Sequence, residues 1–335
     1  MKFVQDETLT PPPGVISSLK SGFDITANHI SIILLPILLD IFLWFGPHLR
    51  IDNLMRDWVV QFNLLSSESI VPASEAQRFE QFQDLLNEAL TLDINLFSFL
   101  RTFPIGISSL MKGFIPGQTP LGTPPSFQAE SVFMIFLWFG GLTLVGWLLG
   151  SIYFTWVAKV SIQDEDQNLL WAGKTVLHAM LLSLIWSAAL FMMGMPLAIM
   201  FMVFAQINPI LAQAALIFLA LFAMWIIVPF FFSAHGIFTK RENVIRSIIS
   251  SFHLSRFTLP TSSFFVLGVL LLSQGFNSLW LVPSDSSWML LISIFGHAFI
   301  TTSLLAASFI YYRDMNIWLE TLLKKIDSKV TSAQF

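Results

Sequence analysis

The 335-residue sequence contains no cysteine and few charged residues. Without cysteine, the chain cannot form a disulfide framework, a thiolate zinc site, an iron–sulfur cluster or a thiol nucleophile. Only 11% of the residues are charged, whereas soluble domains carry about 25%, so too few polar side chains are present to cover a water-facing surface. The basic residues form no stripe that could neutralise phosphates, and we expect no nucleic-acid partner.

Catalytic and ligand-binding motifs are missing as well. The sequence has no H-E-x-x-H, no G-x-S-x-G, no glycine-rich phosphate loop and no pair of intramembrane carboxylates. His29, His48, His235 and His253 are scattered near the ends of apolar runs without metal-ligand spacing. We therefore expect no catalytic residue, no metal site and no cofactor. An enzymatic role stays open but is not favoured.

Long apolar runs are what the sequence does contain. Hydrophobic residues make up 55% of the chain, and the mean hydropathy is +0.73. Crossing the hydrocarbon core takes about 20 apolar residues in a helix. Six segments qualify: 28–46, 132–157, 178–205, 209–232, 261–283 and 287–312. The sequence therefore predicts an all-α, polytopic membrane helical bundle, with about six transmembrane helices in one membrane domain over residues 1–335 and the lipid bilayer as its partner.

Details within these segments refine the prediction. Residues 206–209 and 284–287 are short enough to make tight hairpins of spans three and four and of spans five and six. Gly194 and Pro196 predict a kink or local unwinding in span three. Gly146 and Gly150 form a G-x-x-x-G pattern that predicts close packing in span two. Because the first 29 residues are polar and no cleavage site follows, we expect the first apolar run to be retained.

The distribution of lysine and arginine predicts the orientation. With six spans, both termini share one side with 12 of the 17 basic residues, and the two short hairpins on the other side carry none. The remaining five lie in the segment 47–131, which is too long to count in this rule. We expect a plasma-membrane protein with both termini and the 233–260 loop in the cytoplasm.

Residues 47–131 form the predicted extracytoplasmic insertion. Apolar residues at helical spacing predict one helix over 50–65 and a second over 76–92, both outside the membrane. Around residues 95–114 the chain turns apolar again, but this stretch is too short to span, and we expect it to lie on the membrane. An irregular Pro- and Gly-rich connector follows over 116–125.

A short pattern recurs before spans one, three and five, at residues 15–29, 166–177 and 241–256. The first and third lead-ins share a small-small-Phe-x-aliphatic core, Ser21-Gly22-Phe23-Asp24-Ile25 and Ser250-Ser251-Phe252-His253-Leu254. The middle copy, Leu170-Trp171-Ala172-Gly173-Lys174, fits only loosely. The pattern indicates three units, each an interfacial elbow helix followed by a membrane hairpin. A chance likeness over five positions is the alternative.

One stretch resembles a known group of proteins. It runs Pro229-Phe230-Phe231-Phe232, then Thr239-Lys240-Arg241-Glu242-Asn243-Val244-Ile245-Arg246-Ser247, and then a further elbow and an apolar helix. It is similar to a broad group of uncharacterised bacterial six-span membrane proteins, which includes the membrane domain attached to some glycerophosphodiester phosphodiesterases. Residues 18–23 look like the opening elbow of that group. The resemblance covers the six-span plan but not residues 47–131, and it implies no activity for the membrane part.

Two ionisable residues lie inside predicted spans, Asp40 in the first and His297 in the sixth. Such groups are costly in lipid and mark functional sites by default. Asp40 lies about 9 Å and His297 about 15 Å from the outer ends of their spans, so they could pair if these spans are neighbours. The structural alternative is that Asp40 caps helix N–H groups near Pro36 or faces an interfacial cavity, while His297 makes one interhelical hydrogen bond.

Three functional hypotheses remain. The sequence favours a non-enzymatic membrane component or accessory. The first alternative is a small transporter or channel that uses a polar site near Asp40 and His297, since transporters place such sites near midplane at broken helices. The second is an intramembrane lipid-handling enzyme, which would need a nucleophile or base beside a partner.

Overall fold

The structure is a computed structural model that describes residues 11–67, 80, 83–84, 86–88, 94–111, 118–163 and 169–333. In chain order its elements are α1 (Val15–Asn28), the 3-10 helix η1 (Ile30–Ile33), α2 (Leu34–Phe45), β1 (His48–Arg50), α3 (Asp52–Ser67), the 3-10 helix η2 (Leu96–Leu100), β2 (Ser126–Gln128), α5 (Val132–Ile162), α6 (Leu169–Ile207), α7 (Pro209–Phe232), α8 (His235–Thr239), α9 (Val244–Trp280) and α10 (Met289–Ala333). The prediction of a helical protein is confirmed, with one small two-stranded ribbon added.

Four described helices are long and apolar enough to cross a membrane. They are α5, residues 173–207 of α6, α9, and residues 289–326 of α10. The first predicted span, 28–46, corresponds to η1 and α2, which pass the same test only together with α1, and the two parts are bent by 95°. The chain is therefore a multi-pass membrane protein by helix length and composition.

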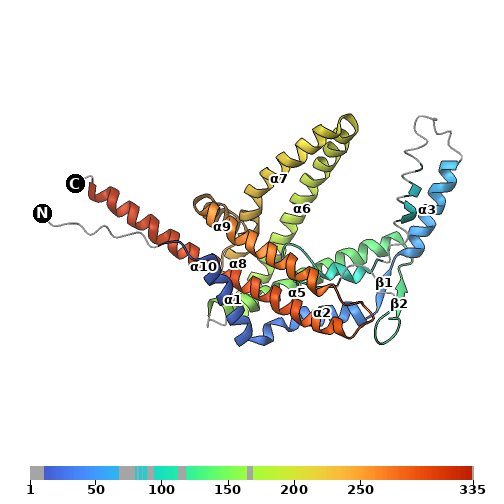
Figure 1. Ribbon diagram of the computed structural model, residues 1–335, viewed down its shortest axis with the longest axis horizontal. Helices are drawn as coiled ribbons and strands as arrows, with labels where there is room; N and C mark the ends of the chain where they lie inside the picture. The colour runs from blue at the N-terminus through green and yellow to red at the C-terminus, as the bar shows by residue number, and fades with distance from the viewer. Residues whose placement is uncertain are drawn as a thin grey trace.

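The helices point in two directions (Figure 1). α2, α5, α9 and α10 lie along one another, whereas the α6–α7 hairpin leaves them near α8 and projects away. No residue in the most apolar stretch of α6 is buried, whereas Ala179 and Leu182 near its start pack in the core. α1 and the C-terminal part of α10 lie at the end of the bundle opposite β1 and β2.

The structure differs from the sequence prediction on where the long helices break. α6 continues as a helix through Gly194 and Pro196, so the local unwinding expected there is wrong. Instead, α9 departs from helical geometry at Thr258, two residues before Pro260. The proline ring removes a backbone donor and crowds the preceding turn. The third lead-in and span five are therefore one kinked helix, and the second lead-in merges with span three.

The lead-ins before spans one and five each make a close contact with another helix. The first lead-in is the separate helix α1, and a Cβ on its Gly22 would overlap the carbonyl oxygen of Ser303 in α10. In the third lead-in, buried Ser251 donates a hydrogen bond to the carbonyl of Pro229 in α7. A Cβ on Gly173 in the middle stretch would have no atom within 4 Å. At Gly173 the middle stretch therefore has no counterpart of the close approach at Gly22.

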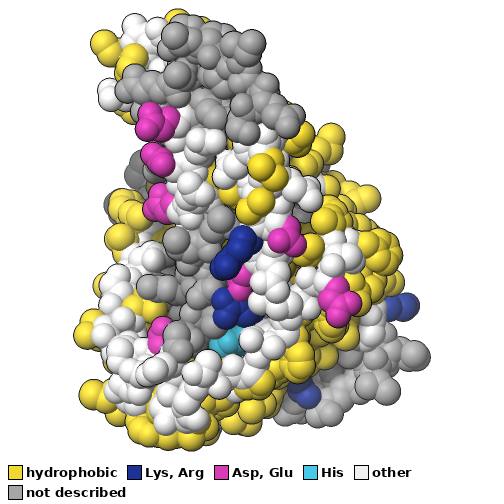
Figure 2. All heavy atoms as spheres, turned by 90° about the vertical axis from the view of Figure 1, so that its right-hand side faces the viewer, with side chains coloured by type: hydrophobic (Ala, Val, Ile, Leu, Met, Phe, Trp, Pro, Cys, Tyr) yellow, Lys and Arg dark blue, Asp and Glu magenta, His cyan; other side chains and the backbone are white. Residues whose placement is uncertain are grey.

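The ends of the insertion are joined by a parallel ribbon, which the sequence did not indicate. β1 pairs with β2, with His48 opposite Ser126. Burial lowers the pKa of the His48 imidazole, which therefore favours its neutral form between the strand and the end of α2. Figure 2 looks onto this end of the molecule, where charged side chains of both signs lie between flanks of hydrophobic ones.

The first helix predicted in the insertion is confirmed as α3. Most of the second, 76–92, lies outside the described residues, although residues 80, 83–84 and 86–88 are helical. Gln83 in this second stretch donates a hydrogen bond to Asn63 of α3 over 3.2 Å. The two stretches therefore touch through polar side chains.

Replacing Gly22 with alanine should separate α1 from α10. The added methyl would overlap the Ser303 carbonyl, and overpacking of this kind typically costs about 1–3 kcal/mol. The melting temperature of the purified protein in detergent should fall by several degrees. Gly173→Ala is the matched control, because open space surrounds that position. Equal melting temperatures for the two variants would contradict the close α1–α10 contact.

Candidate functional site

The segment 94–111 enters the helical bundle, and the prediction that it lies on the membrane is wrong. Its Ile105 and Ile107 are buried in the main hydrophobic core, and Ser108 donates a hydrogen bond to Thr301 of α10 over 2.8 Å. Thr301 is about 18 Å along α10 from Met289, near the middle of a hydrocarbon core about 30 Å thick. Residues 94–111 thus enter the bundle and leave it again, and they are called the re-entrant loop for this reason.

The two glycines of α5 make room for this loop. A Cβ on Gly146 would lie 2.6 Å from the carbonyl oxygen of Leu100, and one on Gly150 would lie 2.6 Å from Gly106. The close packing predicted from the G-x-x-x-G pattern is thus confirmed, but the partner is irregular backbone instead of a second helix. The indole N–H of Trp147, also in α5, donates to the carbonyl of Phe103 over 3.4 Å.

Asp40 holds the returning end of the re-entrant loop. Its side chain is fully buried. It accepts a hydrogen bond from the hydroxyl of Ser109, and the backbone N–H groups of Leu110 and Met111 donate to it over 3.0 Å and 3.3 Å. Unpaired backbone donors are very costly where no water reaches them. The Asp40 carboxylate therefore supplies the acceptors that allow this non-helical backbone inside the bundle.

Arg101 links the two ends of the loop. It donates a hydrogen bond from its guanidinium to the carbonyl of Met111 and interacts electrostatically with Asp40. The same guanidinium also has an electrostatic interaction with the imidazole of His297. Sequence reasoning treated Arg101 only as one of the uncounted basic residues in a long segment, because nothing in the local pattern shows that its loop folds back into the bundle.

Asp40 and His297, the two predicted site residues, lie on neighbouring helices but form no hydrogen bond with each other. α10 contacts both α1 and α2, so the first and last spans are neighbours, as the pairing required. Among the described residues, the hydrogen bonds to Asp40 come from Ser109, Leu110 and Met111, and none comes from His297. Within the described part of the chain, the buried Nε2 of His297 has no hydrogen-bond partner. The structural alternative, in which Asp40 caps N–H groups, describes Asp40 better, although the groups belong to the loop and not to the helix near Pro36.

A polar seam continues from the loop into the bundle. Besides the Ser108–Thr301 bond, the buried hydroxyl of Tyr153 in α5 lies 2.7 Å from Thr302 Oγ1 in α10. These hydroxyls pair across three elements, and interhelical bonds of this kind stabilise membrane helix contacts by about 1 kcal/mol each. The run Thr301-Thr302-Ser303 could have signalled this seam in the sequence, but its partners lie more than 140 residues away.

This arrangement favours fixed structure over reaction chemistry. Ser109 donates its hydroxyl hydrogen bond to Asp40, but the carboxylate is enclosed and already satisfied by loop N–H groups. Among the residues that the structure describes, no three His, Asp or Glu side chains come together as a metal site. No protein-family model, curated protein sequence or solved structure matches the chain.

Replacing Asp40 should destabilise the protein in proportion to the acceptors lost. Asp40→Leu leaves the Ser109 hydroxyl and two backbone N–H groups unpaired, and each unsatisfied buried group costs about 1–3 kcal/mol. Asp40→Asn keeps one oxygen in place and loses mainly the attraction to Arg101. Melting temperatures in detergent should fall in the order wild type, Asn, Leu. A leucine variant as stable as the wild type would show that Asp40 does not hold the loop.

Proposed function

We propose that this chain is a six-span protein of a bacterial plasma membrane, with both termini in the cytoplasm. We further propose that it is a non-enzymatic membrane component, whose helical bundle holds the insertion 47–131 as a fixed cap on the outer face. The observation that carries this proposal is the buried contact between Asp40 and the re-entrant loop. An insertion that only linked two spans would not need a carboxylate inside the bundle to secure it.

The helix boundaries support the six-span arrangement. α7 has 24 residues, about 36 Å at the rise of an α-helix, which is enough to cross a hydrocarbon core. The bent α1–α2 pair supplies the first crossing, with α1 as the cytoplasmic elbow. With α5, α6, α9 and α10 these would make six crossings, and the basic loops would then share the side of the termini, in agreement with the positive-inside rule.

The elbow between α7 and α9 supports the proposed relation to the bacterial six-span group. α7 ends at Phe232, the short α8 follows, and buried Ser247 at the start of α9 donates back to the carbonyl of Ser233 over 2.7 Å. The Arg246-Ser247 pair thus lies where that group is expected to carry its basic-Ser pair. The serine closes the elbow, and the exposed arginine remains available to the membrane surface.

A small transporter or channel is the second candidate. Re-entrant loops at membrane depth occur where they are buried in protein or line a path for solutes. The unpartnered Nε2 of buried His297, near Arg101, favours this role. Against it stands the enclosure of Asp40, whose carboxylate is occupied by loop donors and fully buried. We therefore place the anchoring function first.

The proposed orientation can be tested with single cysteines, since the chain has none of its own. Cysteines replacing Ser17 and Ser328 should not react with an impermeant thiol reagent in intact cells, but should react after the membrane is opened. A cysteine replacing Ser126, an exposed residue of β2, should react from outside. Labelling of either terminal position in intact cells would contradict the proposed topology.

The anchoring role predicts a disulfide between the loop and α10. The hydroxyl oxygens of Ser108 and Thr301 are 2.8 Å apart, so the double variant Ser108→Cys, Thr301→Cys should cross-link on mild oxidation, whereas Ser126→Cys with Thr301→Cys should not. The single Thr301→Cys variant is the second control. A closed interior should protect it from hydrophilic thiol reagents on both sides, and ready labelling would favour the transport function instead.

A further inference from the structure

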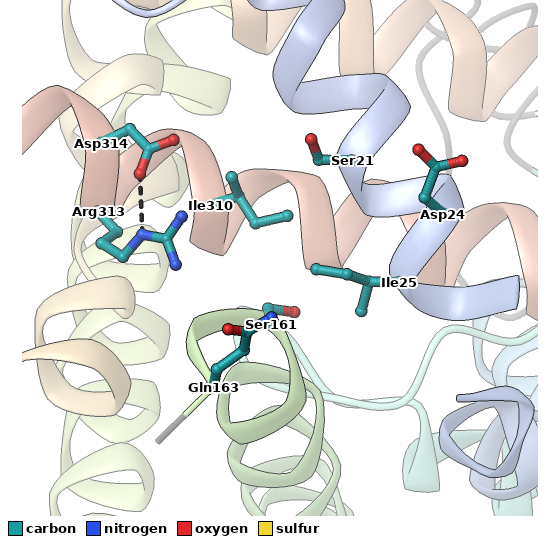
Figure 3. A pocket seen from close by; sticks show the side chains of 8 residues that line it. All are labelled: Ser21, Asp24, Ile25, Ser161, Gln163, Ile310, Arg313 and Asp314. Carbon is teal, nitrogen blue, oxygen red and sulfur yellow. Dashed lines mark hydrogen bonds and ion pairs between the residues drawn. The ribbon is translucent and has the colours of Figure 1, made fainter. Parts of the chain in front are cut away.

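A hollow of about 330 Å³ lies at the cytoplasmic end of the bundle, away from the re-entrant loop (Figure 3). Its walls come from α1, from the last turn of α5 and from α10. Ile25 of α1 and Ile310 of α10 line its apolar part, and charged or polar side chains surround them. Binding sites for drug-sized molecules occupy about 300–1,000 Å³, so this hollow suits a small polar group.

One side of the hollow offers donors to an anion. Arg313 uses its Nε atom to bind the neighbouring Asp314 over 2.8 Å. In Figure 3 the end of its guanidinium points into the space above Gln163, away from that carboxylate. The two terminal nitrogens can therefore donate to an oxyanion in the two-pronged geometry that suits a phosphate.

The other side offers acceptors to a cation. Asp24 of α1 borders the hollow, and α5 ends against it at Ser161 and Gln163. The last carbonyl groups of a helix lack intrahelical partners and carry a partial negative charge. In α5, the N–H of Gln163 donates to the carbonyl of Lys159, and the hollow lies beside this partially negative end of the helix. The lining therefore favours an ammonium group opposite the guanidinium.

We propose that this hollow binds the headgroup of phosphatidylethanolamine from the cytoplasmic leaflet. Its phosphate bonds to the Arg313 guanidinium, and its ammonium bonds to Asp24 and the end of α5. A primary ammonium uses these acceptors, whereas the trimethylated group of phosphatidylcholine has no N–H to donate. Phosphatidylglycerol lacks the positive charge and meets two carboxylates, Asp24 and Asp314. Headgroup sites between helices at the cytoplasmic surface are a known form of lipid recognition. The proposal rests on the membrane orientation described above but not on the anchoring role.

The test uses the full-length chain, purified in detergent and stripped of lipid. Native mass spectrometry measures the binding of phosphatidylethanolamine, phosphatidylcholine and phosphatidylglycerol with identical acyl chains. We expect phosphatidylethanolamine to bind at least tenfold more tightly than the other two. Arg313→Gln and Asp24→Asn should each weaken it about tenfold, since each removes a charge-assisted hydrogen bond. Arg313→Lys should restore part of the affinity because it keeps the charge.

Two controls and one soluble ligand separate the outcomes. Arg256→Gln and Asp285→Asn remove charges outside the hollow and should leave lipid binding unchanged. Every variant should keep the melting temperature of the wild type. Equal affinity for the three lipids, or equal loss in the control variants, would overturn the proposal. Glycerophosphoethanolamine bound as tightly as the lipid would identify a soluble ligand and overturn the lipid assignment. These measurements in detergent do not depend on the Ser108–Thr301 cross-link, so the anchoring role and the lipid site can fail separately.

Discussion

The fold depends on satisfying the backbone of the re-entrant loop at membrane depth. Irregular backbone exposes N–H and C=O groups that lipid cannot satisfy, so such a loop persists only where protein supplies the partners. Asp40 supplies acceptors for Leu110 and Met111, and Arg101 supplies a donor to the Met111 carbonyl. An aspartate at a helix centre costs about 3 kcal/mol on insertion scales, and the bonds that it accepts from the loop offset this cost.

The surrounding helices are shaped by that loop. α5 carries glycines at 146 and 150 because the loop backbone passes where side chains would otherwise project. α10 turns Thr301 toward the loop and Thr302 toward Tyr153, so its central turns are polar although they lie inside the membrane. The α6–α7 hairpin has no such role, and its side chains are apolar and exposed along most of its length. The protein thus divides into a bundle fitted around the loop and a hairpin that meets lipid.

The end of the bundle that carries α1 is built on a different principle, close contact between small residues. Gly22 brings α1 against the backbone of α10, and Ser251 brings α9 against the end of α7. Small side chains allow this approach, and their hydroxyls satisfy free carbonyls at helix ends. The hollow beside Arg313 lies between α1, α10 and the end of α5. An outer anchor and an inner lipid site would together hold the bundle at both membrane surfaces.

Local pattern determined most helices of this protein. The apolar runs predicted the first residues of α5, α7 and α10 to within a few positions. The lead-in predicted over 15–29 corresponds to α1. The same reasoning identified Asp40 as a buried residue that needs a partner, because a carboxylate within an apolar run is costly wherever it points. Each of these inferences uses residues that are near one another in the chain.

The tertiary structure decided which partner Asp40 has and where the loop lies. Segment 94–111 is apolar enough for a membrane surface or a bundle interior, and its own sequence does not distinguish the two. The choice is made by Gly150, Thr301 and Asp40, which lie about 40 to 200 residues away and leave space and hydrogen-bond partners for it. Hydrophobic periodicity reports on one helix at a time, whereas the satisfaction of buried polar groups depends on elements that meet only after folding.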